Sequence, residues 1–149
     1  MQNDIKSLER YISILFRNRP RTEFEIRDRS SKKGYSEEDI EIVVEKLKNI
    51  DLIDDKRFAI MYIEDGFRLK LKGRKLLQIE LKKLGVENSI VDDAFTEIDE
   101  EICIDELLKN DFERNGTKNP QKWAARMSRR GFEYYEIKNV LKEYEADHY

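Results

Sequence analysis

The chain has 149 residues, a net charge of −3 at pH 7 and one cysteine, Cys103. A single cysteine excludes an internal disulfide and a cysteine-based zinc site, and we expect Cys103 to lie in the core as a small hydrophobic residue. Charged residues make up 41% of the chain, with only two prolines and six glycines, a composition that favours an all-α protein with much exposed surface.

No signal peptide is visible, and no segment is apolar over a length that could cross a membrane. The apolar stretch from Tyr11 to Phe16 is directly followed by Arg17, whereas a membrane-spanning helix needs about 20 apolar residues. We therefore expect a cytoplasmic protein with no membrane partner.

The first predicted repeat, residues 5–50, contains three helices. A stripe of apolar residues predicts a helix near residues 5–16. Thr22 begins a capping-box pattern that starts the second helix, and Gly34 ends that helix. Ser36 starts the third helix.

The second predicted repeat, residues 54–98, begins its first helix after Asp54-Asp55, which suit the positive N-terminal end of a helix. The alternating stretch at residues 67–71 is short, and we interpret it as the end of that helix. A second helix is predicted at about residues 74–84, and a third begins near residue 87.

The third predicted repeat, residues 99–145, opens with a long helix that ends around Asn115-Gly116. Asn119-Pro120 has the pattern of an N-cap followed by a proline at the first helical position. Gly131 ends this second helix, and the last helix covers about residues 133–145.

The same sequence pattern, a glycine followed by apolar residues at fixed positions, occurs in all three repeats. Gly34, Gly85 and Gly131 each end a basic stretch and precede the same apolar pattern at the sixth, ninth, tenth and thirteenth following positions. These positions hold Ile40, Val43, Val44 and Leu47, then Val91, Ala94, Phe95 and Ile98, then Ile137, Val140, Leu141 and Tyr144. Because such spacings lie on one helical face, we predict three tandem three-helix repeats in an elongated array. This architecture favours a modular binding surface over a catalytic pocket.

Charge alternates along the chain. Residues 67–84 carry seven basic residues and one acid, and residues 114–130 carry six basic residues and no acid. Residues 87–113 carry eleven acids and one lysine. Stacked repeats would align the basic segments into a stripe that attracts a polyanion or an acidic protein surface. The alternative is that these are solvated faces that neutralise each other within a repeat.

The residue types needed for catalysis or metal binding are scarce. His148 is the only histidine, so a histidine-dependent triad or metal cluster cannot form. Adjacent carboxylates such as Asp54 and Asp55 point about 100° apart on a helix, and we interpret them as capping residues. No glycine-rich phosphate loop is present. We therefore expect no enzymatic activity, no cofactor and no bound metal.

Two nucleic-acid interpretations are weighed against simpler ones. Trp123 lies in a basic segment and could stack on a base, but it shares one helical stripe with Met127, which favours core packing. A helix-turn-helix that reads duplex DNA is disfavoured, because the helices after Gly34 and Gly85 begin with acidic residues.

Four stretches resemble the RecX family, the bacterial regulators of the recombinase RecA. They are Arg17–Ile26, Asp54–Ala59, Gly73–Val86 and Arg129–Phe132, in order and at repeat spacing. The resemblance implies a single RecX-like domain of three-helix repeats in a curved, elongated body. It also implies binding in the helical groove of a RecA filament on single-stranded DNA. The implied effect is inhibition of RecA recombinase, ATPase and coprotease activity, by blocked filament extension or promoted disassembly.

From charge placement we predict a basic surface that contacts RecA or DNA. Its residues are Arg57, Arg68, Lys70, Lys72, Arg74, Lys75, Lys82, Lys83, Arg126, Arg129 and Arg130. The expected partner is a RecA filament, with single-stranded DNA as a second partner, and the chain is expected to be a monomer. Two alternatives stay open: a module that binds single-stranded DNA without RecA, and a repeat scaffold for another protein.

Overall fold

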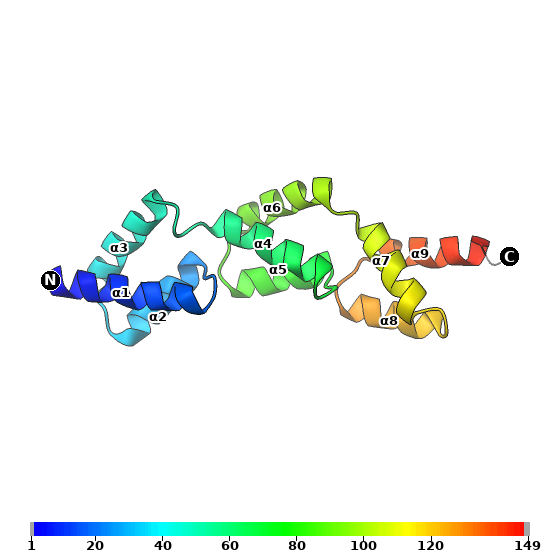
Figure 1. Ribbon diagram of the computed structural model, residues 1–149, viewed down its shortest axis with the longest axis horizontal. Helices are drawn as coiled ribbons and strands as arrows, with labels where there is room; N and C mark the ends of the chain where they lie inside the picture. The colour runs from blue at the N-terminus through cyan, green and yellow to red at the C-terminus, as the bar shows by residue number, and fades with distance from the viewer. Residues whose placement is uncertain (1, 148–149) are drawn as a thin grey trace. The chain divides into compact units, whose positions relative to one another are not determined.

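The computed structural model describes residues 2–147, with side chains from Asp4 onward (Figure 1); His148 lies outside this range. The helices are α1 (Gln2–Asn18), α2 (Glu23–Lys33), α3 (Glu37–Asn49), α4 (Asp55–Arg68), α5 (Arg74–Lys83), α6 (Asn88–Glu101), α7 (Ile104–Asn115), α8 (Pro120–Arg129) and α9 (Tyr134–Asp147). No strand occurs in the described range, so the predicted all-α class is confirmed. None of the helices between residues 2 and 147 combines the length and hydropathy needed to cross a bilayer.

The chain divides into two compact units. The first unit comprises the residues up to Ala59 together with Leu81–Val91, and the second comprises Ile60–Glu80 and the residues from Asp92 onward. Helices α4, α5 and α6 each contribute residues to both units.

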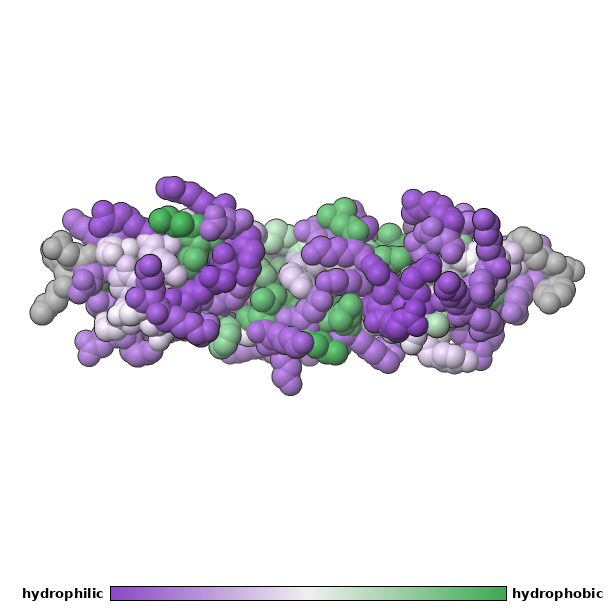
Figure 2. All heavy atoms as spheres, turned by 90° about the horizontal axis from the view of Figure 1, so that it is seen from below, coloured by the Kyte–Doolittle hydropathy of each residue, from purple (hydrophilic) through white to green (hydrophobic). Residues whose placement is uncertain are grey.

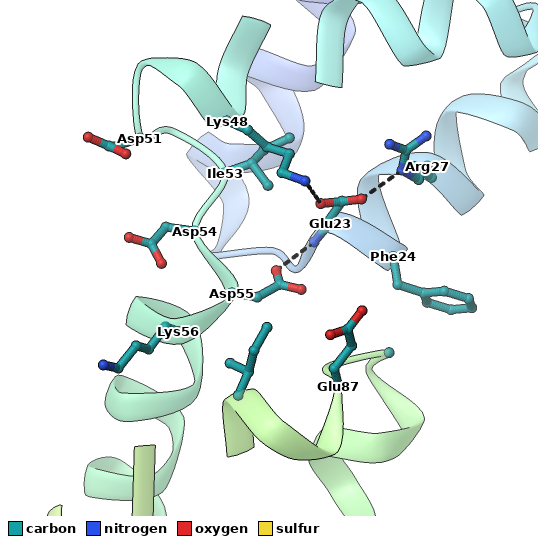
Figure 3. A pocket seen from close by; sticks show the side chains of 12 residues that line it. Glu23, Phe24, Arg27, Lys48, Asp51, Ile53, Asp54, Asp55, Lys56 and Glu87 are labelled. Atoms are coloured by element: carbon teal, nitrogen blue, oxygen red, sulfur yellow. Dashed lines mark hydrogen bonds and ion pairs between the residues drawn. The ribbon is translucent and has the colours of Figure 1, made fainter. Parts of the chain in front are cut away.

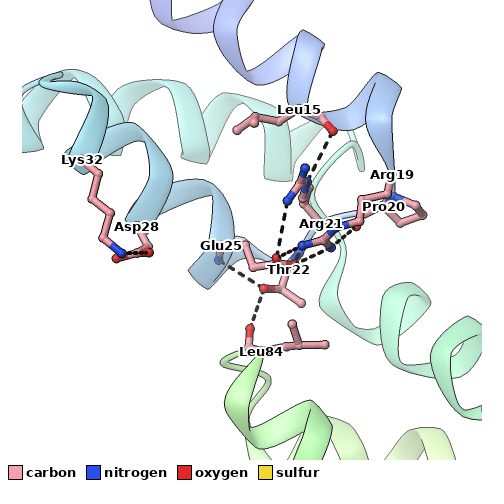
Figure 4. A network of polar contacts seen from close by, with 9 residues as sticks. All are labelled: Leu15, Arg19, Pro20, Arg21, Thr22, Glu25, Asp28, Lys32 and Leu84. Carbon is pink, nitrogen blue, oxygen red and sulfur yellow. Dashed lines mark hydrogen bonds and ion pairs between the residues drawn. The ribbon is translucent and has the colours of Figure 1, made fainter.

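The first unit buries the facing sides of α1, α2 and α3. Its core residues share an apolar side chain with almost no exposure: Leu8, Ile12, Leu15, Ile26, Ile40, Val43, Val44, Leu47 and Ile53. The predicted capping box starts α2, since Thr22 Oγ1 accepts the N–H of Glu25 at 3.2 Å and Glu25 accepts the N–H of Thr22 at 3.2 Å. Thr22 also donates its hydroxyl to the carbonyl of Leu84 at 2.6 Å, which joins α2 to the end of α5 (Figure 4).

The second unit contains an aromatic core between α7, α8 and α9. Trp123 is fully buried beside Met127, as the shared stripe predicts. The Trp123 ring meets Phe112 edge-on with centroids 4.9 Å apart, and its indole N–H donates to Asp111 at 2.9 Å. Trp123 is therefore a packing residue, because its ring is not open to a base.

The three glycines of the repeated sequence pattern adopt one conformation. Gly34, Gly85 and Gly131 have φ of 109°, 83° and 95°, the left-handed region that favours glycine. In each copy the glycine N–H bonds the carbonyl three residues earlier, at 3.0 to 3.1 Å. The following N–H bonds the carbonyl five residues before it, at 3.1 to 3.2 Å. This Schellman-type ending turns the chain back, and α3 then contacts α2 and α9 contacts α8.

Two of these turns also lie against the start of another repeat's second helix. In the second unit, the N–H of Gly73 bonds the carbonyl of Arg130 at 2.7 Å, and the N–H of Lys75 bonds the carbonyl of Gly131 at 3.2 Å. Within the first unit, the side chain of Phe24 fills the space that a Cβ atom on Gly85 would need. A side chain at Gly85 would clash with the Phe24 side chain, and one at Gly131 with the backbone of Leu76.

Two sequence expectations are wrong at the connection between α6 and α7. Helix α6 continues to Glu101 and α7 begins at Ile104, so the long helix expected from about Asp99 does not exist. Cys103 is exposed rather than in the core. It occupies the extended N-cap position of α7 with φ −93° and ψ 106°, while the neighbouring Ile102 takes the buried place.

Substituting Gly131 by alanine should destabilise the fold more than the same change at Gly34. Both glycines have positive φ, and this strain alone costs about 1–2 kcal/mol. A Cβ on Gly131 would lie 2.6 Å from the backbone nitrogen of Leu76, whereas a Cβ on Gly34 meets nothing within 4 Å. Overpacking should add about 1–3 kcal/mol at Gly131. Urea unfolding of both variants measures the difference, and equal losses would contradict the close approach.

Candidate functional site

Most of the predicted basic residues near α4 and α5 already have partners in the chain. Lys72 contacts Glu80 at 2.8 Å, and Lys75 contacts Glu133 at 3.2 Å. Arg74 contacts Asp99 at 2.6 Å and lies 4.4 Å from the centre of the Phe95 ring. These cations are neutralised within the second unit, but only the pair of Lys72 lies within one predicted repeat, because Asp99 and Glu133 belong to the third.

Two further predicted residues make weaker or more local contacts. Arg68 lies 3.8 Å from Glu64 one turn earlier in α4. Arg57 donates to the carbonyl of Asp51 at 2.7 Å, a residue with a positive φ of 59°. Both arginines are exposed, so these contacts leave much of each guanidinium open to a partner.

The ion pair of Arg74 has a counterpart of opposite sign in the first unit. Glu23 contacts Lys48 at 3.1 Å. Glu23 and Arg74 each stand eleven residues before the repeat glycine, and Lys48 and Asp99 each stand fourteen after it. The same positions therefore carry the same type of bond with the charges exchanged.

Arg130 is a structural residue. Its guanidinium donates to the carbonyls of Leu71 at 2.8 Å and Lys70 at 2.5 Å. Leu71 is one of the two non-glycine residues with positive φ among those described, at 48°. Arg130 thus holds the turn after α4 against the end of α8, and only part of its surface is exposed.

The environment of Glu80 lowers the pKa of its carboxyl group. Burial raises this pKa, but hydrogen bonds from Lys72 and from the Tyr62 hydroxyl, the latter at 2.9 Å, outweigh burial, and the pKa falls below its usual value. Glu80 therefore stays charged and holds Lys72 in place.

Helix α8 carries three basic residues that form no ion pair in the described part of the chain. Asn119 accepts the N–H of Lys122 at 3.1 Å and Pro120 stands at the helix start, which confirms the predicted N-cap. Lys122, Arg126 and Arg129 follow at spacings of four and three, so they share one helical face, distinct from the buried face of Trp123. We name these three residues the α8 ridge; within residues 2–147 none of them forms an ion pair.

The sequence prediction contained Arg126 and Arg129 but not Lys122. Lys122 lies one helical turn before Arg126, and this spacing would have identified it as part of the same basic face. Lys82 and Lys83 also have no ion pair in the described chain, but they end α5, where a cation is favoured by the helix dipole. Lys70 is exposed in the turn after α4. These residues belong to different segments, whereas the α8 ridge is one continuous surface.

A polar cleft of about 640 Å³ lies in the first unit (Figure 3). Two of its acids bond the protein: Glu23 contacts Arg27 at 2.9 Å as well as Lys48, and Asp55 accepts the N–H of Glu23 at 2.9 Å. Burial raises the pKa of Asp55 and outweighs the hydrogen bond from the N–H of Glu23, which lowers it. Asp54 accepts the N–H of Arg57 at 3.0 Å, which confirms it as a cap. Glu23, Asp54 and Asp55 in this cleft therefore have a structural role.

The surface outside these contacts is mainly hydrophilic. Figure 2 shows one face on which polar residues predominate and hydrophobic atoms form separate patches. In the part of the chain that the structure describes, no three histidine, cysteine or acidic residues are grouped as a metal site.

Known proteins resemble this chain over most of its length. The family models for the first and second three-helix domains of RecX match residues 18–47 and 54–94. The regulatory protein RecX of Prosthecochloris aestuarii is 33% identical over 141 residues and 93% of each chain. That of Thermotoga petrophila is 33% identical over 135 residues, 89% of this chain and 81% of the relative. The crystal structure of RecX from Lactobacillus salivarius aligns with a TM-score of 0.75 and 25% identity, over 96% of this chain and 97% of that one.

Replacing Arg130 by alanine should destabilise the fold, whereas the same change at the adjacent Arg129 should not. Arg130→Ala leaves two backbone carbonyls without their charged donor, a loss of about 1–3 kcal/mol. Arg129→Ala removes an unpaired surface charge and should stay within about 0.5 kcal/mol of the parent. Urea unfolding midpoints measure both. Equal stability of the two variants would remove the distinction between paired and unpaired cations.

The contribution of Glu80 to stability should depend on pH. Its pKa in the folded chain lies below the ordinary value of 4.5, so its ion pair stabilises fully above that value and is lost as the pH falls through the lowered pKa. Glu80→Gln should therefore be less stable than the parent at pH 7 and approach it at low pH. Urea unfolding from pH 7 to pH 2.5 tests this, and Lys72→Met should remove the same pH-dependent difference.

Proposed function

Because the chain belongs to the RecX family of regulatory proteins, we propose that it regulates RecA filaments on single-stranded DNA and has no enzymatic activity of its own. It acts inside the filament groove, where it blocks filament extension or promotes disassembly, and so lowers RecA recombinase, ATPase and coprotease activity. The family assignment supports the partner, and the α8 ridge is the observation in this chain that carries the contact.

The α8 ridge is poorly explained by stability alone. Like charges one turn apart on a helix destabilise it by about 0.2–0.5 kcal/mol per pair. No acid occurs from Arg114 to Arg130 to offset this repulsion. By contrast, Lys72, Arg74 and Lys75 each neutralise an acid of the same unit. A surface that keeps unpaired like charges together is suited to an anionic partner, which releases counterions or supplies the missing carboxylates.

The remaining predicted contact residues play different parts in this proposal. Arg57, Arg68, Lys70, Lys82 and Lys83 are exposed and serve as secondary contacts. Arg130, Lys72, Arg74 and Lys75 act mainly by holding the fold, since their charged groups are engaged. Reversing the charge of these four residues would break contacts within the fold, so a loss of binding could not be distinguished from a loss of structure.

Charge reversal of the α8 ridge tests the proposal. The triple variant Lys122→Glu, Arg126→Glu and Arg129→Glu should raise the concentration for half-inhibition of the RecA ATPase on single-stranded DNA by about tenfold or more, because opposed like charges cost several kcal/mol at an interface. The ATPase rate with titrated protein is the measurement, and circular dichroism verifies that helicity is kept.

A matched control is available in α1. Lys6, Arg10 and Arg17 are exposed and form no ion pair in the described chain, so their reversal to glutamate makes the same change in net charge at another place. Inhibition should stay close to that of the parent. Equal effects of the two triple variants would reduce the ridge to a net-charge effect and contradict the proposal. A module acting on DNA alone would bind bare oligonucleotides tightly and would not affect RecA.

A further inference from the structure

Two adjacent tyrosines at the start of α9 are unusually exposed. Tyr134 is 75% exposed and Tyr135 is 65% exposed, more than any other aromatic side chain in residues 4–147. Helix α9 packs through Ile137 and Val140, which are buried, and the tyrosines lie off that face. No packing interaction in the fold accounts for two open rings at this place.

Two lysines without an ion pair in the described part of the chain follow the tyrosines on α9. Lys138 lies one turn after both, with its Nζ 5.5 Å from the centre of the Tyr134 ring, and Lys142 follows one turn later. The two nearby acids are engaged: Glu133 contacts Lys75 at 3.2 Å, and Glu136 accepts the N–H of Glu133 at 2.8 Å. Neither lysine has an ion pair in the described part of the chain.

The tyrosines are close to the α8 ridge. Only the four residues of the turn separate Arg129 from Tyr134, so their Cα atoms are at most about 18 Å apart. The exposed rings and the α8 ridge are therefore close along the chain, and both belong to the second unit. This combination is what single-stranded nucleic acids require: aromatic faces for the bases and a cationic groove or strip for the backbone.

We propose that Tyr134, Tyr135 and Lys138 form a binding site for single-stranded DNA, in which the rings stack on bases and Lys138 contacts a phosphate. The site rests on the proposed function, since it would let the chain hold the DNA strand of the filament while the α8 ridge continues the anionic contact. It places base stacking on α9 rather than on Trp123, which the sequence had offered as the candidate.

A nucleic acid fits this site better than a protein surface does. Protein hot spots lie within a packed patch that a ring of neighbouring side chains closes off from water. Within α7 to α9, Tyr134 and Tyr135 are the only large hydrophobic side chains that are strongly exposed, while Met61, Leu69 and Ile79 are exposed elsewhere in the same unit. Lysines flank the two tyrosines. Two rings flanked by lysines offer little apolar area to a protein but a complete stacking face to a base.

The test compares two probes of equal charge: a fluorescein-labelled single-stranded oligothymidylate and an abasic strand of the same length. Tyr134→Ala with Tyr135→Ala should weaken binding of the oligothymidylate by about tenfold per ring, since stacking contributes on that order. Binding of the abasic strand should not change. Tyr134→Phe with Tyr135→Phe keeps both rings and should bind as the parent, while leucine at both positions should behave like alanine.

Salt dependence adds an independent readout. Lys138→Gln should reduce the slope of log affinity against log salt by about 0.7, the value for one contact to a single strand, whereas the alanine pair should leave the slope unchanged. Equal loss with the two strands, or full binding by the alanine pair, would overturn the stacking site. Full binding by the leucine pair would also overturn it, because an apolar docking surface tolerates leucine.

The outcome is separable from that of the proposed function. The RecA ATPase assay with the α8 ridge variant tests regulation, and the two-strand comparison tests stacking without RecA. If the alanine pair binds both strands normally but loses RecA inhibition, the tyrosines contact RecA and the DNA site is wrong. If ridge reversal leaves RecA inhibition intact while the alanine pair loses oligothymidylate only, the DNA site stands and the proposed route of regulation fails.

Discussion

A left-handed glycine turn between the second and third helix of each repeat is the constraint on which the structure depends. At Gly34, Gly85 and Gly131 the positive φ allows the turn to close its own hydrogen bonds and send the next helix back along the previous one. At Gly85 and Gly131 the absent side chain also admits another segment of the same unit. One residue type therefore serves the fold of a repeat and its contact with a neighbour.

The basic residues fall into two groups once the partners are known. Lys72, Arg74, Lys75 and Arg130 stabilise the second unit through carboxylates or backbone carbonyls. The α8 ridge has no such partners in the described chain. A count of charges along the sequence gives residues 67–84 and residues 114–130 the same weight, although Lys72, Arg74 and Lys75 of the first segment are held in ion pairs. Function is therefore better inferred from pairing than from charge density.

Sequence patterns predicted the helices well where local chemistry marks their ends. The capping residue Thr22 and the Asn119-Pro120 start were correct because capping involves only a few neighbouring residues. The boundary between α6 and α7 was missed, since no glycine or proline marks it, and with it the exposure of Cys103. Ion pairing between helices could not be predicted, because partners such as Arg74 and Asp99 are distant in sequence and meet only in the fold. The exposure of Tyr134 was equally hidden, as a helical stripe identifies the buried face but not what the other faces are for.

The exchanged charges at equivalent positions bear on how a chain of similar repeats avoids assembling in the wrong order. Helix α2 correctly placed brings Glu23 to Lys48, and α5 correctly placed brings Arg74 to Asp99. If the second helices changed places during folding, Glu23 would face Asp99 and Arg74 would face Lys48. Both misassembled pairs would bring like charges together and would repel. The order of the charges in these ion pairs therefore favours the correct placement of α2 and α5 over the exchanged one.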